Sequence, residues 1–528
     1  MRIAAFDLGS NSFHLLVADA HPDGTFEQVV TDKEMLRLGS VVAATGEIGR
    51  TGATAAVEVV RRFRAMAESQ RADEIVACAT AAFREASDSS AVVDRIEAEA
   101  GVKIRVISGR EEARLIFDAV RASVTIDPGP ALALDLGGGS LEVMVGGGRG
   151  LEWAVSLKLG VARLTAELVR SDPLSPADVR RVAQTVTKAV QRVLPEIRQR
   201  RPGVAIGSSG TLEALIRLAA WRRNGVAPVS VNQLTVTARE IESLSAALLR
   251  MTAAERAALP GVDARRADLL PAGVLLLGVV LDLTGTSELV GCEWALREGM
   301  VLDAIGHHSR AEWDADPRAM RRESVLNLCR RYGWNEAHST KVARLALELF
   351  DGTSALHDLA GADRDLLELG ALLHDIGEHV SKDAHERHTA YLIENARLRG
   401  FSPEEIGVLA CLGRFHKRGT PKPSFEPFAR MKETRQKKVT QLVALLQIAD
   451  GLDRSHGGPV QDVHVYANRD VVEVVVEADD DIDLELWGLR RKRDLFERVF
   501  DCRLDVVDAQ LALTLDRDDR VTRIGHHR

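Results

Sequence analysis

Short apolar runs flank a glycine-rich turn at the start of the chain. Residues 2–6 and 14–18 are two such runs around the sequence DLGSNS, which predicts a strand, a tight turn and a second strand. The same arrangement recurs where residues 131–134 lead into DLGGGS and residues 141–145 follow. Because both units share D-L-G-x-x-S, we expect a repeated strand-turn-strand unit that opens two related lobes.

Around these turns, helix-like and strand-like segments alternate. Helical periodicity occurs at residues 57–66, 92–98, 111–121, 176–198 and 212–220, and strand-like runs occur at 74–78, 104–107 and 204–206. This alternation is typical of α/β proteins. The most apolar stretch, residues 269–283, is too short to span a bilayer and predicts a buried helix.

The pattern changes after residue 305. The polar, turn-rich residues 306–320 predict a linker, and residues 321–453 are helical throughout, with helices expected at 339–350, 365–375, 403–415 and 437–450. From residue 463, two β-like runs, an acidic turn at 479–483, a basic helix at 487–500 and a last strand-like stretch predict a small α/β domain. We therefore expect four domains, at residues 1–125, 126–305, 316–457 and 458–528.

Composition narrows the class of protein. The 528 residues are 45% hydrophobic and 28% charged, with a formal net charge of -8, which fits a globular protein and argues against nucleic-acid and membrane-surface partners. The five cysteines are widely spaced, so neither a disulfide framework nor a thiolate zinc site is expected. No long apolar segment precedes the first acidic residue, which predicts a cytoplasmic location.

The paired turns carry the clearest chemistry. Glycines that adopt positive φ let consecutive backbone N–H groups converge on an anion such as phosphate. Asp7 and Asp135 end their strands, and Glu142 lies just past the second turn, where carboxylates can hold Mg²⁺ against phosphate oxygens. A single such turn could be an ordinary β-hairpin, but its duplication with aspartates favours a phosphate cradle. Kinase, ATPase and hydrolase all remain open at this point.

Several segments, in order, resemble one known family. FDLGSNSFHLLVAD, DLGGGSLE, ATAAFRE, VISGREEARLIFDAV, GSSGTLEAL, LLPAGVLLL and ALREGMVLDAI are similar to motifs of the exopolyphosphatase / guanosine pentaphosphate phosphohydrolase (Ppx/GppA) family, over roughly residues 1–305. This family is a branch of the actin-like (ASKHA, ribonuclease H-like) superfamily. The resemblance implies an α/β protein with two actin-like lobes that removes the terminal phosphate of inorganic polyphosphate or of guanosine pentaphosphate (pppGpp).

The resemblance also implies roles for single residues. The phosphates are held by Gly9, Ser10, Asn11, Ser12, Gly137, Gly138, Gly139 and Ser140, and Mg²⁺ is held by Asp7, Asp135 and Glu142. Arg84 neutralises a phosphoryl group with its planar fork of donors. Glu112 is the general base, with Glu111 as the alternative, because adjacent helix residues face different directions and only one can point into a cleft. A surface arginine and an acidic helix N-terminus are the plain structural alternatives.

One position departs from the family pattern. Leu141 stands where the family usually has threonine, which removes a hydroxyl beside the expected phosphate site. We interpret this change as a modulation of substrate preference or rate, with a partly degraded phosphatase as the alternative.

The helical segment carries a second set of candidate ligands. His374 and Asp375 lie side by side in LGALLHDIGEH, with His338 before them and Asp450 in LLQIADGLD after them. They resemble the H…HD…D pattern of the HD phosphohydrolases, and His388 and His416 are further candidates. Imidazole and carboxylate together suit a second divalent metal or a Mg²⁺/Mn²⁺ pair. The alternative is an HD-like fold whose histidines only pack or form hydrogen bonds.

Four functional alternatives stay open beside exopolyphosphatase and pppGpp hydrolase. They are a small-molecule kinase with GSSGT at its nucleoside site, a non-catalytic (p)ppGpp or nucleotide sensor, hydrolysis at the HD-like site, and a decayed enzyme.

The resemblance implies that the helical domain extends the substrate cleft and supports a homodimer. Basic residues at 490–493 and between 417 and 438 predict either a path for a long polyanion or a solvated helix face.

Overall fold

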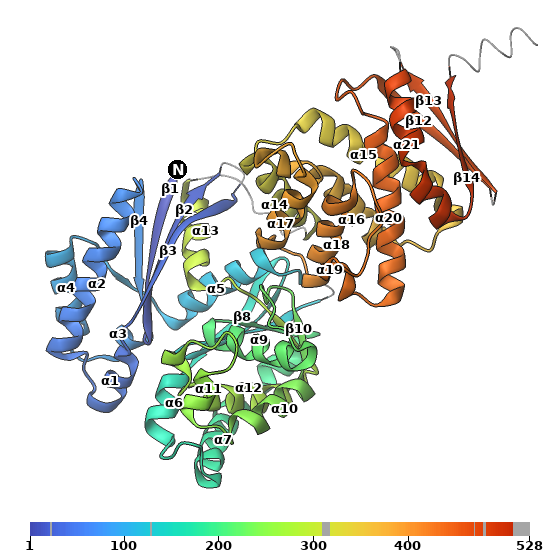
Figure 1. The fold of residues 1–528 in the computed structure, drawn as a ribbon. Helices are drawn as coiled ribbons and strands as arrows, with labels where there is room; N and C mark the ends of the chain where they lie inside the picture. The colour runs from blue at the N-terminus through green and yellow to red at the C-terminus, as the bar shows by residue number, and fades with distance from the viewer. Residues whose placement is uncertain (22–23, 127–128, 309–316, 469, 479–481, 510–528) are drawn as a thin grey trace, which may run out of the picture. The chain divides into compact units, whose positions relative to one another are not determined.

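The computed structural model of the chain describes residues 1–21, 24–126, 129–308, 317–468, 470–478 and 482–509 (Figure 1). It forms two compact units, Met1–Ala319 and Met320–Arg528. Helix α13 (Leu296–His308) ends the first unit and α14 (Pro317–Arg331) leads into the second, so the middle of the predicted linker lies outside the described residues. Most of the predicted acidic turn at 479–483 also lies outside them.

The first lobe is built on a five-stranded sheet in the order β3-β2-β1-β4-β5. Strands β1, β2 and β3 pair antiparallel, and β4 and β5 continue parallel to β1. The strands are β1 (Arg2–Leu8), β2 (Ser12–Ala20), β3 (Phe26–Met35), β4 (Glu74–Ala79) and β5 (Arg105–Val106). The helices are α1 (Leu38–Thr45), α2 (Gly49–Ser69), α3 (Ala81–Glu85), α4 (Ser89–Ala100) and α5 (Gly109–Ser123).

The second lobe repeats this topology. Its strand order is β10-β11-β9-β6-β7-β8, so β6, β7, β8, β9 and β11 stand where β1 to β5 stand in the first sheet, and β10 is added at the edge. The strands are β6 (Ala131–Leu136), β7 (Leu141–Gly147), β8 (Gly150–Leu157), β9 (Val204–Ser208), β10 (Thr235–Thr237) and β11 (Glu288–Gly291). The predicted duplication of an actin-like lobe is therefore confirmed.

Helices surround the second sheet, and their ends follow local capping signals. They are α6 (Val161–Leu168), α7 (Pro176–Gln191), α8 (Leu194–Arg200), α9 (Gly210–Asn224), α10 (Ala238–Leu248), α11 (Ala253–Ala257), the 3-10 turn η1 (Ala264–Arg266) and α12 (Leu270–Thr284). At the start of α7, Ser175 and Asp178 form a capping box, with Pro176 in the first turn. The predicted helix at 176–198 is in fact two helices, α7 and α8, with Pro195 near the start of the second.

Three apolar cores hold the first unit together. One lies within each lobe, and the third lies between the two sheets, where α13 packs on the first sheet, α5 packs on the second, and the two helices contact each other. In this shared core, Ile3 and Ala5 of β1, Phe117 of α5 and Met144 of β7 are all fully buried. Because burial of apolar surface is the dominant favourable term in folding, the shared core fixes one lobe against the other.

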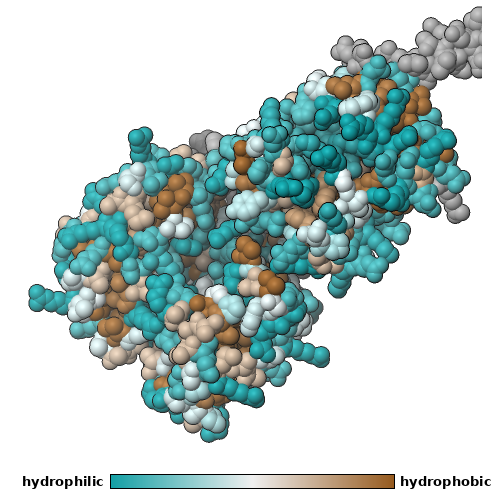
Figure 2. Space-filling model, viewed as in Figure 1, coloured by the Kyte–Doolittle hydropathy of each residue, from teal (hydrophilic) through white to brown (hydrophobic). Residues whose placement is uncertain are grey.

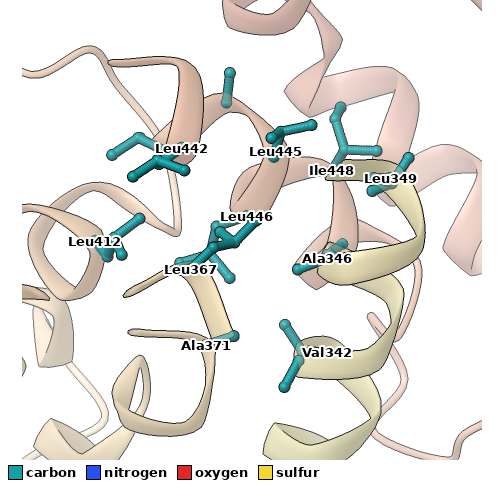
Figure 3. Packing of buried hydrophobic residues seen from close by; sticks show 14 of the residues in the cluster. Val342, Ala346, Leu349, Leu367, Ala371, Leu412, Leu442, Leu445, Leu446 and Ile448 are labelled. Carbon is teal, nitrogen blue, oxygen red and sulfur yellow. The ribbon is translucent and has the colours of Figure 1, made fainter. Parts of the chain in front are cut away.

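The second unit is a helical domain with a small sheet. Its elements are α14, α15 (Glu336–Gly352), η2 (Ser354–Leu356), α16 (Gly361–Leu373), η3 (Ile376–His379), α17 (His385–Asn395), α18 (Pro403–Phe415), α19 (Glu426–Ala429), α20 (Glu433–Gly451), β12 (Val460–Ala467), β13 (Val471–Ala478), α21 (Asp483–Phe500) and β14 (Arg503–Asp508). The sheet has the order β12-β13-β14. Figure 3 shows its core, where α20 lies against α15, α16 and α18 through Val342, Ala346, Leu349, Leu367, Ala371, Leu412, Leu442, Leu445, Leu446 and Ile448.

Two strands with a mixed burial pattern were not predicted from the sequence. β3 and β8, which complete the two antiparallel halves, alternate too weakly to be recognised by period alone.

Within the described residues, no helix combines the length and apolar character that crossing a membrane requires. On the face seen in Figure 2, hydrophilic residues dominate and hydrophobic ones form small separate groups.

Candidate active site

The two glycine-rich turns meet at a cavity of about 550 Å³ in the first unit. Each turn closes the hairpin at the C-terminal end of its lobe's central strand, β1 or β6. The cavity is lined by most of the predicted site residues: Asp7, Gly9, Ser10, Asn11, Ser12, Glu112, Asp135, Gly137, Gly138, Gly139 and Ser140. Arg84 and Glu142 lie just behind it, since Arg84 contacts Glu112 and Glu142 pairs across the hairpin with Asp135.

The turn glycines are needed for close approach, and the predicted positive φ was wrong. Among the described residues, Gly9, Gly137, Gly138 and Gly139 all have φ outside the left-handed region. A Cβ on Gly138 would stand 2.7 Å from Asn11 Cβ, and one on Gly139 would stand 2.6 Å from Ser10 Oγ. The second turn therefore lies against the first, and only glycine leaves room for that contact.

Hydroxyl groups of the first turn are partly used inside the protein. Ser10 Oγ accepts a hydrogen bond from the backbone N–H of Ala82 at 3.0 Å, which ties the turn to the start of α3. Ser12 Oγ lies 2.8 Å from His14 Nε2. These contacts fix the shape of the turn before any ligand enters.

Four carboxyl groups crowd together around the cavity. Burial, together with the nearby Glu112 carboxylate, raises the pKa of Asp7 to about 8. Burial also raises the pKa of Asp135 to about 6, against the opposing hydrogen bond from Ser208 Oγ at 2.6 Å. The pKa of Glu142 is raised well above its ordinary value by burial and by the charges of Glu112 and Asp135. A cation in their midst would relieve this repulsion.

The donor set fits Mg²⁺. Glu142 Oε1 accepts a hydrogen bond from Ser156 Oγ at 2.7 Å, whereas the buried Glu142 Oε2 has no hydrogen-bond partner within the described residues. The buried Asn11 Oδ1 likewise has none there. Oxygen atoms of carboxylates and amides are the ligands that this hard cation takes, usually with several waters.

Arg84 and Glu112 form an ion pair beside the cavity. Arg84 Nη1 donates to Glu112 Oε2 at 2.6 Å and to the carbonyl of Ile107 at 3.0 Å. Glu112 lies in the first turn of α5, whose N-terminus is capped by Ser108 Oγ. Its neighbour Glu111 points away and pairs instead with Arg105 at 2.7 Å. Only Glu112 of the two faces the cavity.

Basic side chains that the sequence did not identify also line the cavity. Lys33 comes from β3, Arg266 from η1 and Arg297 from α13. Burial and the neighbouring Arg266 guanidinium lower the pKa of Lys33 to about 8. The buried Arg266 Nε has no hydrogen-bond partner within the described residues. No local pattern marks these three residues, because only the fold brings them together.

Leu141 does not line the cavity. It is fully buried in β7, opposite Leu136 of β6, and belongs to the core of the second lobe. The predicted loss of a hydroxyl beside the phosphates therefore has no counterpart in the geometry, because this side chain packs against other apolar groups.

The second unit gathers the histidines and aspartates of the HD-like pattern. His338 of α15, His374 and Asp375 after α16, and Asp450 of α20 come within contact distance of one another, with His338 Nε2 3.2 Å from His374 Nε2. Burial lowers the pKa of His374 to about 4, so its ring is neutral at pH 7. Residues from α15, from α20 and from the segment just after α16 thus form one cluster of potential metal ligands.

The wider ligand set differs from the sequence prediction. His416 joins the cluster as expected, but the structure brings in His385 and leaves His388 outside the ligand groups found among the described residues. The two histidines lie three positions apart on α17, and His385 is at the end that faces Asp375. The sequence also missed Asp453, whose Oδ2 lies 2.7 Å from His338 Nδ1.

Comparison with known proteins agrees with this architecture. Residues 16–308 match the model of the Ppx/GppA phosphatase family, and residues 320–492 match that of the Ppx/GppA phosphatase, domain III. The chain belongs to the Ppx/GppA phosphatase family. The resemblance recognised in the ordered segments of the sequence is therefore confirmed.

Individual relatives of this Ppx/GppA protein include exopolyphosphatase 1 of Mycobacterium tuberculosis, which is 36% identical over 306 residues, 57% of this chain and 88% of the relative. Exopolyphosphatase 1 of Mycobacterium leprae is 33% identical, over 62% of this chain and 94% of the relative. The crystal structure of an exopolyphosphatase from Cytophaga hutchinsonii is similar with a TM-score of 0.55 and 28% identity, covering 58% of this chain and 98% of that one. The Aquifex aeolicus family member has a TM-score of 0.50 and 25% identity, covering 59% and 99%.

Proposed function

We propose that this Ppx/GppA protein is a Mg²⁺-dependent exopolyphosphatase, which hydrolyses the terminal phosphate of inorganic polyphosphate. The observation that carries the proposal is the composition of one cavity, which both phosphate turns line together with carboxyl groups and the basic side chains of Lys33, Arg266 and Arg297. Carboxylates suit a divalent cation, and basic side chains suit the remaining charge of a polyanion.

In the proposed reaction, a water oxygen forms a new bond to the terminal phosphorus while the bridging P–O bond to the chain breaks. Glu112 accepts a proton from that water, and the shortened chain leaves as an anion. Mg²⁺ held by Asp7, Asp135 and Glu142 would neutralise phosphate oxygens and orient the terminal group. The residues of the two turns hold the terminal phosphates in place for this attack.

We propose that Arg84 acts both on the general base, Glu112, and on the phosphoryl group of the substrate. Its Nη1 is committed to Glu112 and to a backbone carbonyl, which orients the base. Its Nη2 makes no hydrogen bond within the described residues, and the side chain is 21% exposed. That nitrogen is therefore free to donate to a phosphoryl oxygen as charge develops there.

The lining of the cavity favours polyphosphate over pppGpp. The described lining consists mainly of glycine, hydroxyl, carboxyl and basic residues, which suit phosphate groups, and it contains no Phe, Tyr or Trp on which a guanine base could stack. Relatives at 33–36% identity bear the name exopolyphosphatase 1, which agrees with this preference. Hydrolysis of pppGpp remains the rival within the same class, and the homodimer, the cytoplasmic location and the four domain boundaries remain predictions.

One assay tests the proposal. Release of orthophosphate from long-chain polyphosphate and from pppGpp is measured with the purified full chain, with and without Mg²⁺ and in the absence of ATP. We expect a higher kcat/KM for polyphosphate and loss of turnover without Mg²⁺. Preference for pppGpp would overturn the substrate, a requirement for ATP would favour a kinase, and tight binding without turnover would favour a sensor.

A further inference from the structure

Two hydroxyl groups hold the carboxylates of the second lobe. Ser156 of β8 stands directly opposite Glu142 of β7, and its Oγ donates to Glu142 Oε1 at 2.7 Å. Ser208 of β9 stands beside Asp135 of β6, and its Oγ donates to Asp135 Oδ2 at 2.6 Å. Each hydroxyl comes from the strand next to the carboxylate, because neighbouring strands lie only about 5 Å apart. One oxygen of each carboxylate is therefore fixed in direction.

The second oxygen of Glu142 is left for a ligand. Glu142 is 1% exposed, yet its Oε2 has no hydrogen-bond partner in the part of the chain that the structure describes. A buried carboxylate oxygen without a partner costs free energy, and a bound cation would remove that cost. Asp135 lines the cavity and pairs with Glu142 across the β6–β7 hairpin. The two carboxylates are therefore placed to hold one cation together.

The internal repeat provides a comparison within the same chain. Strands β1 and β4 of the first lobe correspond to β6 and β9 of the second, and Asp7 corresponds to Asp135 in the shared D-L-G-x-x-S turn. By strand register, Cys78 stands beside Asp7 where Ser208 stands beside Asp135. Cys78 Sγ accepts from Arg105 Nη2 at 3.8 Å, and no hydrogen bond to the Asp7 carboxylate forms within the described residues. The first lobe thus has the carboxylate without the hydroxyl.

Two further positions differ between the lobes in the same direction. The places of Glu142 and Ser156 are taken in the first lobe by His14 and Lys33. An ammonium group repels a divalent cation, whereas a carboxylate attracts one. Although the two lobes share one topology, the second lobe has the set of side chains that suits a cation.

Ser156 also lies against the helix that carries the proposed base. A Cβ on Gly109, the first residue of α5, would stand 2.6 Å from Ser156 Cβ and 3.0 Å from its Oγ. Only glycine lets β8 approach the start of α5 this closely. Glu112 lies in the first turn of the same helix. Ser156 therefore connects Glu142 to the element that holds Glu112.

We infer that Ser156 and Ser208 are positioning residues for the divalent cation of the phosphate cavity. Their hydroxyls hold one oxygen of Glu142 and one of Asp135, so that the remaining oxygens are presented to the cation in a fixed direction. Loss of such a partner typically costs about 10–100-fold in metal affinity. The inference rests on the proposed Mg²⁺-dependent function, but it does not depend on polyphosphate being the substrate.

Calorimetric titration of the full chain with Mg²⁺, without substrate, tests the inference. Mg²⁺ is used because the imidazole-rich cluster of the second unit favours transition metals. Ser156→Ala removes only the hydroxyl and keeps the Cβ that contacts Gly109. We expect the dissociation constant to rise about tenfold or more in Ser156→Ala and in Ser208→Ala. The matched control is Cys78→Ala, at the equivalent position of the first lobe, which should keep the affinity of the wild type.

The outcomes separate this inference from the proposed function. Unchanged Mg²⁺ affinity in both serine variants, or an equal loss in Cys78→Ala, would overturn the inference and leave the proposed function standing. A loss in one serine variant alone would remove the role of the other serine. A wild type that binds no Mg²⁺, or an Asp135→Asn variant that titrates like the wild type, would overturn both.

Two further measurements distinguish positioning from a purely structural role. Thermal unfolding without Mg²⁺ shows whether Ser156→Ala and Ser208→Ala only weaken the fold, in which case the unfolding temperature falls and the Mg²⁺ affinity does not change. If the hydroxyls position the cation ligands, excess Mg²⁺ should restore most of the turnover of Ser208→Ala. It should not restore the turnover of Glu112→Gln, which lacks the proposed base. A loss in Ser208→Ala that excess Mg²⁺ leaves unchanged would contradict the inference.

Discussion

Arg84 Nη1 lies 2.6 Å from Glu112 Oε2 at the edge of the phosphate cavity. The Glu112 side chain is 9% exposed, and burial raises its pKa, while the charge and hydrogen bond of Arg84 oppose that rise. Arg84 therefore holds the carboxylate in one orientation. Because the pKa of Glu112 is still raised overall, Glu112 is a stronger base than a fully solvated glutamate. The following predictions begin from this pair.

Glu112→Gln removes the proposed base but keeps the size and a hydrogen-bond acceptor. We expect kcat for polyphosphate to fall by about 100-fold or more, because general base catalysis typically contributes that much. The matched control is Glu111→Gln, which changes the adjacent residue paired with Arg105 outside the cavity. Similar losses in the two variants, measured as orthophosphate release, would contradict the assignment of the base.

Arg84→Lys keeps the positive charge but loses the planar fork that contacts Glu112 and the carbonyl of Ile107 together. We expect kcat to fall by about tenfold and the acidic limb of the pH–rate profile to shift, with a larger loss in Arg84→Met. If Arg84 only stabilised the fold, thermal melting would drop and the pH–rate profile would keep its shape.

Gly138→Ala places a methyl group 2.7 Å from Asn11 Cβ and so forces the two turns apart. Such overpacking costs about 1–3 kcal/mol, and we expect a rise in KM together with a fall in kcat. The control is Gly278→Ala in α12, where, apart from the adjacent residues and the backbone of the helix itself, no described atom lies within 4 Å of the added methyl. That variant should keep its activity and gain about 0.5–1 kcal/mol in the free energy of unfolding. Unchanged kinetics in Gly138→Ala would show that the turns need not touch.

Leu141→Thr restores the residue type usual in the family. Because the side chain is fully buried among apolar groups, we expect a loss of about 1–3 kcal/mol in the free energy of unfolding and little change in substrate preference. Denaturant unfolding and the ratio of kcat/KM for polyphosphate and pppGpp measure the two effects. A changed ratio with unchanged stability would place this residue in the phosphate site after all.

Asp363 makes the stability of the second unit depend on pH. Burial alone would raise its pKa, but the backbone N–H of Ala360 at 2.9 Å and the side chains of Arg435 and Lys438 outweigh burial, so the pKa is lowered. A carboxyl whose pKa is lower when folded adds stability above its unfolded pKa of about 3.9, and this stability is lost as pH falls through the folded pKa.

Asp363→Asn should therefore lower the free energy of unfolding by about 2 kcal/mol at pH 7 and flatten its fall below about pH 4. Urea unfolding of the full chain between pH 7 and about 3 measures this dependence. Asp358→Asn, at an exposed position of the same segment, is the control and should follow the wild type. A variant as steep as the wild type in acid would assign the pH dependence to other carboxyl groups.

Much of the fold could be predicted from local pattern. Strands β1, β2, β6 and β7 were expected within two residues of their ends, and α18 was expected at its observed bounds, because its capping box and apolar period are both local. β3 and β8 were missed because an edge strand with one exposed face needs its neighbour to be recognised. A single helix was predicted at 176–198, where the structure has two, because the helical periodicity continues across the break before Pro195.

The sequence by itself determined the duplicated D-L-G-x-x-S turns, the α/β and helical halves, and the H…HD…D pattern, because each depends on spacing within one segment. Only the tertiary structure showed that Glu112 and not Glu111 faces the cavity, and that His385 and not His388 lies beside Asp375. Only the tertiary structure brought Lys33, Arg266 and Arg297 to one cavity. It also brought Lys492 to Asp450 in the second unit. It also replaced positive φ with close approach as the reason for the turn glycines. These outcomes depend on side chains from segments far apart in the chain, whose meeting is decided by packing between elements rather than by any local period.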